Sequence, residues 1–281
     1  MKNKEIKTAM FMMIVCAVLW SIGGLFIKLI NWNAVAIAGA RSFFSALTVL
    51  VYMAVTKQKI RFSKNVFLSM IFLSGLFFCF VVANKLTTSA NAIVLQYSSP
   101  VFILIFSFFI FNEKITGHDV ISVILVMVGI VVFFIDSIGA GRTVGNVLGV
   151  VSGIFMAALF ICVGKTEGEE KMSGILMGHL LTAVIGLPFL LKGDCTVNGQ
   201  SIFYVIVLGV VQLGIPYILM ALASKNCPPL PSCLISTIEP LLNPLWVAIF
   251  YGEIPGLWAI VGGIIIIFAV TYQCIKSINK A

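Results

Sequence analysis

Apolar residues in this chain form long runs, and charged residues fall almost entirely in the short breaks between the runs. A helix of about 20 residues crosses the hydrocarbon core of a bilayer. The runs therefore predict ten membrane-spanning helices joined by short loops. The expected spans lie near residues 9–28, 34–55, 66–84, 91–111, 117–135, 145–164, 173–191, 201–224, 231–250 and 256–275.

The chain also repeats itself at half its length. The segment 92–113 recurs 140 residues later as the segment 232–253. Such a long period indicates two related structural units, which we expect at residues 1–140 and 141–281. Five crossings per unit is an odd number, so the second unit enters the membrane from the opposite face. The expected fold class is an all-α integral membrane protein with ten transmembrane helices in two inverted five-helix repeats.

Composition excludes a water-soluble globule, because the chain is 60% hydrophobic and only 10% charged, with a mean hydropathy of +1.14. No soluble domain offers a face for nucleic acid, so the net charge of +8 needs another explanation. With the N-terminus inside, most of the 18 Lys and Arg residues fall on the inner side. This predicts a multi-pass protein of the plasma (inner) membrane with both termini cytoplasmic.

Polar residues inside the spans are few. Ser232, Ser236, Glu239 and Asn243 are spaced four, three and four apart, which predicts a polar stripe along one helix face. Such a stripe must face a partner helix or a watery cavity. Glu239 is the only acidic residue expected deep in a span. It is a candidate site for a proton or a cationic substrate; alternatively it caps a broken helix or neutralises Arg41.

Prolines mark where the helices of both repeats are expected to break. Pro240 cannot donate to the carbonyl of Ser236, and Pro100 cannot donate to that of Gln96. Pro244 removes a further bond in the second repeat. Freed carbonyls at matching depths are typical of broken-helix binding sites, although a proline kink also serves packing alone.

Two further ionisable residues lie within spans, each with two interpretations. Arg41 either anchors an anionic substrate group or, as we favour, snorkels to the interface. His179 is a candidate proton relay, against the commoner role of a packed histidine. Aromatic and amide side chains complete the candidate cavity. The predicted substrate-binding residues are Trp20, Gln96, Tyr97, Gln212, Tyr217, Ser236, Glu239 and Asn243.

Small residues and cysteines are expected to pack. Gly145, Gly149 and Gly153 form consecutive small-xxx-small steps, which permit close helix contact within the protomer or between protomers of a homodimer. The seven cysteines are scattered without a CxxC pair and are expected as small buried hydrophobes. Neither a metal nor a cofactor is expected.

These features resemble the drug/metabolite transporter superfamily, in its ten-helix EamA-type branch. The resemblance covers nearly the whole chain. It rests on Leu19–Lys28 (LWSIGGLFIK), Arg41, the pairs Pro100…Glu113 and Pro240…Glu253, and the dipeptide Glu239-Pro240. It implies a metabolite or amino-acid transporter, usually an exporter, with a central cavity between spans one, three, four, six, eight and nine. The sixth span departs from the pattern, since Met156 and Ala157 stand where the first repeat has Trp20 and Ser21.

The expected function is secondary transport of a small metabolite (an amino acid, an amine or a related compound) by alternating access, most readily as an exporter. Its partners would be the substrate, the lipid bilayer and, as a candidate coupling ion, protons. A membrane enzyme would need clustered acids, a Ser–His pair or an HExxH motif, and the sequence holds none of these. A channel or a structural membrane partner stays open as the alternative.

Overall fold

The computed structural model describes residues 2–87, 89–136, 138–139, 143–192, 195–251 and 256–280, without the side chains of a few helical residues in these ranges. Helices are the only regular elements there. The first half contains α1 (Lys2–Ser21), α2 (Gly23–Lys28), α3 (Ala34–Val55), α4 (Lys64–Leu86), α5 (Ser89–Gln96), α6 (Ser99–Phe109) and α7 (Gly117–Phe133). The second contains α8 (Thr143–Lys165), α9 (Glu170–Leu191), α10 (Gly199–Val207), the π-helix η1 (Leu208–Gly214), α11 (Ile215–Ala223), α12 (Pro229–Ser236), α13 (Ile238–Tyr251) and α14 (Leu257–Lys280).

The all-helical fold class is confirmed, and most of the expected spans appear as helices. In the described residues, seven helical stretches are long and apolar enough to cross a membrane, and α7 is a shorter apolar helix. The expected spans 9–28 and 231–250 are each interrupted, between α1 and α2 and between α12 and α13. Large apolar side chains such as Phe109 and Leu191 are 73% and 74% exposed, as a lipid-facing surface requires.

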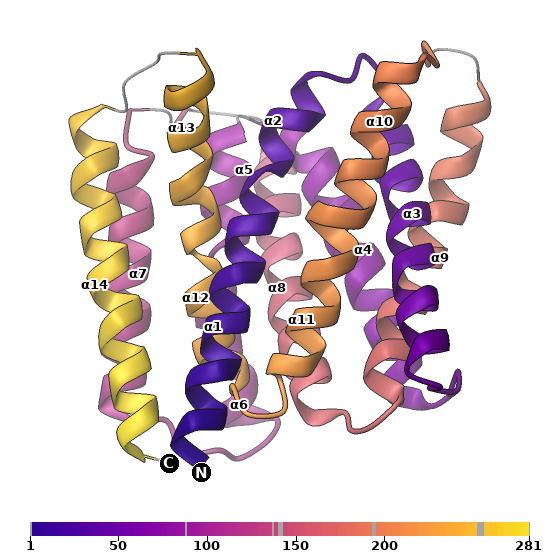
Figure 1. Ribbon diagram of the computed structural model, residues 1–281. Helices are drawn as coiled ribbons and strands as arrows, with labels where there is room; N and C mark the ends of the chain where they lie inside the picture. The colour runs from indigo at the N-terminus through magenta and orange to yellow at the C-terminus, as the bar shows by residue number, and fades with distance from the viewer. Residues whose placement is uncertain are drawn as a thin grey trace.

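The helices stand side by side, and both chain termini lie at one end of the molecule, which we call the terminal face (lower end in Figure 1). Contacts between helices follow a two-fold pattern. Two helices of the first half pack against their own counterparts in the second: α3 on α9 and α7 on α14. Other contacts occur in matched pairs, so that α4 on α8 is mirrored by α11 on α1. This pattern is what two structurally related halves produce.

Glycines allow the self-paired helices to approach each other. A Cβ at Gly186 of α9 would lie 2.5 Å from the Cα of Gly39 in α3. A Cβ at Gly262 of α14 would lie 2.5 Å from the carbonyl oxygen of Gly129 in α7. Membrane helices gain little from burying apolar surface, so close backbone packing of this kind stabilises their association.

The glycine steps of α8 pack inside the chain. A Cβ at Gly145 would lie 2.7 Å from the backbone of Leu86, and one at Gly153 would lie 2.8 Å from the carbonyl oxygen of Gln96. Gly149 lies between them, against Leu95. Of the two interpretations of this motif, packing within the protomer is the one seen.

Helix breaks fall at corresponding places in the two halves. The first separates α5 from α6 at residues 97–98, and the second separates α12 from α13 at Thr237. Pro100 and Pro240 occupy the first turns of α6 and α13, where a missing N–H costs no hydrogen bond within the helix that begins there. The side chains of Asn243 and Pro244 lie outside the described residues.

Replacing Gly186 by Ala should lower the apparent melting temperature of the detergent-purified protein by several degrees. The added methyl group must displace the backbone of α3, and overpacking of this kind costs roughly 1–3 kcal/mol. Gly199→Ala is the matched control, since a Cβ there meets no atom within 4 Å. Equal melting temperatures for the two variants would contradict the role given to the contact between Gly39 and Gly186.

Candidate functional site

Polar and aromatic side chains from both halves meet in the interior, and we refer to them as the central cluster. Its members are Trp20, Arg41, Phe77, Tyr97, His179, Gln212, Tyr217 and Glu239. Seven of the eight are more than nine-tenths buried, and Glu239 is half-buried. Six of them are residues that the sequence singled out as binding or coupling candidates, and these now lie within one connected group.

Arg41 of α3 is only 7% exposed and points into the bundle. Its guanidinium carbon lies 5.4 Å from the ring centre of Phe77, and its Nη1 donates a long bond of 3.4 Å to Oε1 of Gln212. The interpretation that Arg41 snorkels to the interface is therefore wrong. The reason is that Arg41 lies on the face of α3 that packs into the bundle, where α3 contacts α9 and η1.

Gln212 is positioned by an irregular helix. It lies in η1, where the wider π-helical turn is a frequent feature of functional sites. Its Nε2 donates to the backbone carbonyl of Trp20 at 3.3 Å. Gly23, at the start of α2, leaves room for this amide, because a Cβ there would lie 2.9 Å from Nε2. The absence of a side chain at Gly23 therefore makes room for Gln212, the residue to which Arg41 donates.

Aromatic rings form the walls between the charged groups. The Tyr217 ring lies 5.5 Å from Trp20, 6.0 Å from Phe77 and 5.1 Å from His179. The rings of Phe77 and His179 are 5.7 Å apart. His179 is packed among these rings, although neither of its ring nitrogens has a hydrogen-bond partner in the described chain.

Glu239 meets the first half of the chain through Tyr97. The Tyr97 hydroxyl donates to Oε2 of Glu239 at 2.8 Å and lies 3.3 Å from the carbonyl oxygen of Ser236. That carbonyl is the one which Pro240 leaves without a helical donor. The break in the second half is thus joined to the break in the first, since Tyr97 sits between α5 and α6.

The predicted polar stripe is not continuous, because the helix is interrupted at Thr237. The hydroxyls of Ser232 and Ser236 donate to carbonyls of Cys227 and Cys233 in the same segment. Both serines therefore satisfy their local backbone, and Ser236 contributes to the cluster through its carbonyl. Gln96 is half-buried at the end of α5, next to Tyr97.

Several buried polar atoms have no hydrogen-bond partner among the described residues, and three of their residues, Trp20, Arg41 and His179, belong to the central cluster. They are Trp20 Nε1, Arg41 Nε, both ring nitrogens of His179, and the hydroxyls of Ser42, Ser45 and Ser74. All lie on α1, α3, α4 or α9. Buried polar groups are nearly always paired with protein, water or ligand. The central cluster therefore has unused capacity to bind a polar molecule.

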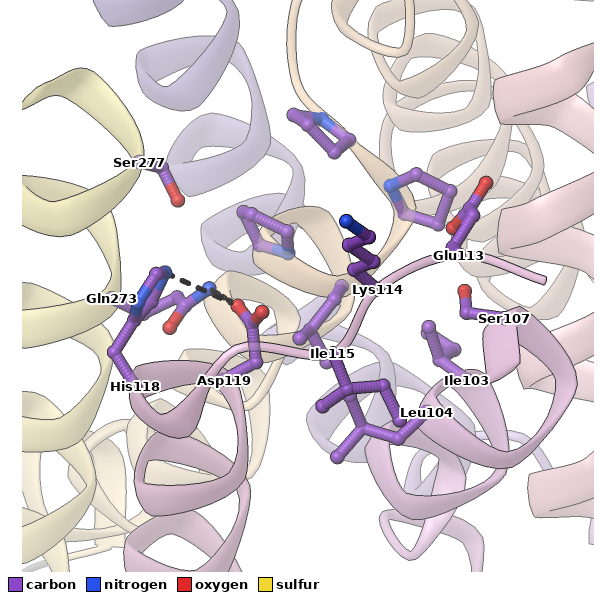
Figure 2. A pocket seen from close by; sticks show the side chains of 14 residues that line it. Ile103, Leu104, Ser107, Glu113, Lys114, Ile115, His118, Asp119, Gln273 and Ser277 are labelled. Carbon is purple, nitrogen blue, oxygen red and sulfur yellow. Dashed lines mark hydrogen bonds and ion pairs between the residues drawn. The ribbon is translucent and has the colours of Figure 1, made fainter. Parts of the chain in front are cut away.

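A pocket lies apart from the central cluster, at the terminal face between α6, α7, α12 and α14 (Figure 2). It has a volume of about 400 Å³ and is lined by Glu113, Lys114, His118, Asp119 and Gln273 among others. None of the residues predicted as binding sites lines it.

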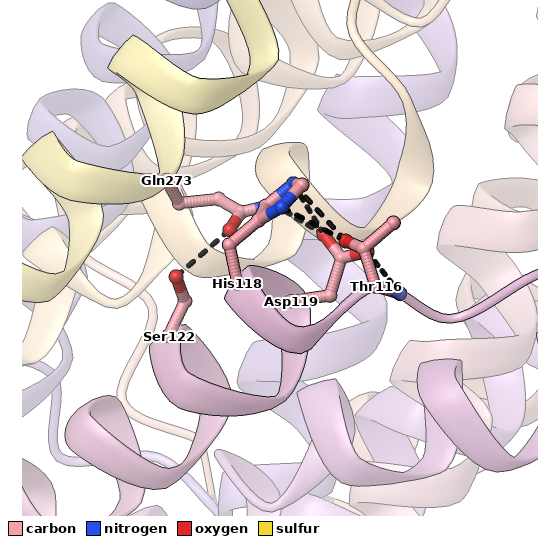
Figure 3. A network of polar contacts seen from close by, with 5 residues as sticks. All are labelled: Thr116, His118, Asp119, Ser122 and Gln273. Atoms are coloured by element: carbon pink, nitrogen blue, oxygen red, sulfur yellow. Dashed lines mark hydrogen bonds and ion pairs between the residues drawn. The ribbon is translucent and has the colours of Figure 1, made fainter. Parts of the chain in front are cut away.

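The buried polar groups of this pocket are satisfied by one another (Figure 3). Gln273 donates to Asp119 and accepts from Ser122, both at 2.8 Å, and the Thr116 hydroxyl also donates to Asp119. The backbone N–H of Thr116 donates to the same carboxylate at 3.1 Å, as part of the capping box that begins α7. This network ties α14 to α7. Since it leaves no buried group of the lining unpaired in the described chain, we assign it a structural role.

Comparison with known proteins identifies the family to which this chain belongs. The model of the EamA-like transporter family matches residues 7–135 and again residues 143–272. The chain belongs to the EamA-like transporter family. This makes it a multi-pass membrane transporter, and the recognition of the drug/metabolite transporter superfamily from sequence is confirmed.

Individual relatives agree. The chain is 24% identical to an "Uncharacterized transporter" of Archaeoglobus fulgidus over 258 residues, covering 92% of this chain and 93% of the relative. It is 24% identical to human "Solute carrier family 35 member G1", covering 92% of this chain and 76% of that protein. One solved crystal structure superposes with a TM-score of 0.82 at 16% identity, covering 96% and 98% of the two chains, which shows a shared fold.

Sequence reasoning found much of this transporter's cluster and missed part of it. The structure joins Trp20, Tyr97, Gln212, Tyr217 and Glu239. Arg41 and Phe77 were absent from the predicted binding residues. A signal for Arg41 existed, because it is a guanidinium inside a span; Phe77 is one of 23 phenylalanines and carries no local signal.

Tyr97→Phe should lower the stability of the transporter by roughly 1.5–3 kcal/mol, because it leaves the Glu239 carboxylate and the Ser236 carbonyl without their donor. Thermal unfolding in detergent would measure the change. Tyr52→Phe is the control, since the structure gives the Tyr52 hydroxyl no bond to any described residue. In a Glu239→Gln background the cost of Tyr97→Phe should shrink; an undiminished cost would mean that the two side chains are not coupled.

Proposed function

We propose that this transporter is a secondary exporter of a small metabolite that carries an amine, such as an amino acid or a related compound, and that it binds the substrate at the central cluster. The observation that supports this most directly is the position of Glu239. The carboxylate lies half-buried beside a helix break, with Tyr97 as its one hydrogen-bond donor among the described residues. A carboxylate has about four acceptor sites, so this one can also accept from a substrate ammonium or bind a proton.

The proposed mechanism is alternating access between two inverted repeats, residues 1–140 and 141–281. Helix breaks at corresponding places, joined through Tyr97, and the two-fold pattern of contacts support it. Two related halves of opposite orientation have two nearly equivalent packings, and exchange between them exposes a central site to each side in turn. We further propose that the protein lies in the plasma (inner) membrane with its terminal face cytoplasmic.

Ion pairs at the terminal face are the contacts that we expect to open during the cycle. The Nζ of Lys165 lies 2.6 Å from Oε1 of Glu113, and the Nε of Arg61 lies 2.7 Å from Oε2 of Glu169. Each pair joins a residue of the first half to one of the second. All four side chains are at least 30% exposed, and exposed pairs contribute at most about 1 kcal/mol. Contacts of this strength hold one conformation without preventing exchange.

The pair at Glu169 stays charged at neutral pH. The Lys59 backbone N–H and the Arg61 side chain both donate to this carboxylate, which holds the pKa of Glu169 below its usual range. A lowered carboxylate pKa means that the contact is intact above the ordinary glutamate pKa and is lost as the pH falls through the lowered value.

Glu239→Gln should fold normally and lose substrate recognition, because the amide keeps an acceptor for Tyr97 but removes the charge. We expect affinity for amines and amino acids to fall about 10-fold or more, with the melting temperature little changed. Ligand-induced thermal shifts, followed by uptake and exchange in liposomes across pH, would measure this. Glu5→Gln, at an exposed position of α1, is the control. Unchanged affinity and pH dependence would remove Glu239 from the mechanism.

Reversing one charge of the pair Lys165–Glu113 should change the exchange rate in liposomes several-fold, since it replaces attraction by repulsion between the halves. The single variants are Lys165→Glu and Glu113→Lys. The double variant restores an opposite-charge pair and should return the rate toward that of the wild type. Wild-type rates in both single variants would show that this contact is no part of the conformational cycle.

A further inference from the structure

The central cluster holds two charged groups of opposite sign that are not paired with each other. In the described residues no ion pair joins Arg41 to Glu239. Each is instead held by a neutral neighbour, Arg41 by Gln212 and Glu239 by Tyr97. The aromatic rings of Trp20 and Tyr217 are part of the cluster that contains both. The cluster is therefore dipolar, with a cationic end on α3 and an anionic end on α13.

The cationic end has more hydrogen-bonding capacity than the protein uses. A guanidinium carries five N–H donors in a planar fork. In this structure one of the Arg41 nitrogens donates at 3.4 Å, while the buried Nε has no partner among the described residues. A buried charge without a close counter-ion is costly, so such a site favours the arrival of an anion. The fork geometry suits a carboxylate, which accepts two parallel bonds.

His179 adds one further donor beside the same ring. It is fully buried, and neither ring nitrogen has a partner in the described part of the chain. The side chains of Arg41 and His179 both lie against Phe77, at 5.4 Å and 5.7 Å from its ring. A neutral imidazole carries one N–H. Both residues therefore adjoin the Phe77 ring, and each has an N–H donor that no described residue accepts.

We propose that Arg41 and His179, beside Gln212 and over the Phe77 ring, form a subsite for the carboxylate of the substrate, separate from Glu239. The proposal rests on the function proposed above and narrows it. A substrate that fills both ends carries a carboxylate and an ammonium group, with an apolar part against the rings of Trp20 and Tyr217. A single fixed cation favours a monovalent carboxylate over a doubly charged phosphate ester, because Glu239 belongs to the same cluster.

Paired ligands that differ by the carboxylate alone test this subsite. The probes are L-leucine, L-methionine and L-phenylalanine, together with the amide and the decarboxylated amine of each. Equilibrium binding to the purified wild-type protein should favour each amino acid over its amide and its amine by about 10- to 100-fold, the range for a hydrogen-bonded charge. Arg41→Gln should abolish this preference by weakening the amino acids, while the affinity for the amines stays unchanged. Glu239→Gln should weaken the amines as well.

Arg41→Lys is a second test in case the Arg41→Gln variant does not fold. It keeps the positive charge and loses the planar fork. It should reduce the preference for the amino acids without removing it. His179→Gln should reduce the preference in the same direction.

Two results would overturn the carboxylate subsite while leaving the proposed transport function intact. The first is wild-type protein that binds the amines and amides as tightly as the amino acids. The second is an Arg41 variant that weakens amines and amino acids equally, which indicates a structural role. Wild-type protein that neither binds nor transports any of the nine compounds would instead overturn the proposed function, and the subsite with it.

Discussion

The need to satisfy every polar group away from water governs this structure. In hydrocarbon an unpaired backbone group costs several kcal/mol, so a helix can break only where another part of the protein takes up the freed groups. The break at Thr237 meets this condition through Tyr97, whose hydroxyl lies beside the carbonyl that Pro240 leaves free and beside Glu239. The same hydroxyl therefore supports an irregular backbone and orients the half-buried carboxylate. Structural stability and the proposed chemistry depend on one side chain.

Close backbone packing explains how the two halves fit without a large hydrophobic driving force. Glycines bring α3 onto α9 and α7 onto α14, each helix against its own counterpart. Each half contributes the same helix to such a contact. In the proposed mechanism the contact can therefore stay intact while the other helices change their packing. The weaker contacts lie at the terminal face, where ion pairs between the halves remain exposed. Close contacts between counterpart helices, together with weak ion pairs at the terminal face, are the combination that the proposed alternating access requires.

The two polar regions of the molecule differ in how fully they are satisfied. At the terminal face Asp119, Gln273 and their neighbours use one another's donors and acceptors, and the result is a tie between α7 and α14. In the centre Arg41 and His179 retain donors that no described residue accepts. Buried polar groups in native proteins rarely stay unpaired. For this reason the proposed substrate site is the central cluster and not the pocket at the terminal face.

The sequence by itself determined the helical membrane fold, the family and the helix breaks beside Pro100 and Pro240. These depend on local rules: the length of an apolar run, the missing N–H of proline and the recurrence of one half in the other. The expected span 34–55 coincides with α3, for instance. Only the tertiary structure decided which side chains meet. The glycine contact between α3 and α9 and the π-helical turn at Gln212 set the surroundings in which Arg41 meets Phe77. Such contacts depend on the angle and rotation of helices far apart in the chain, which no local pattern specifies.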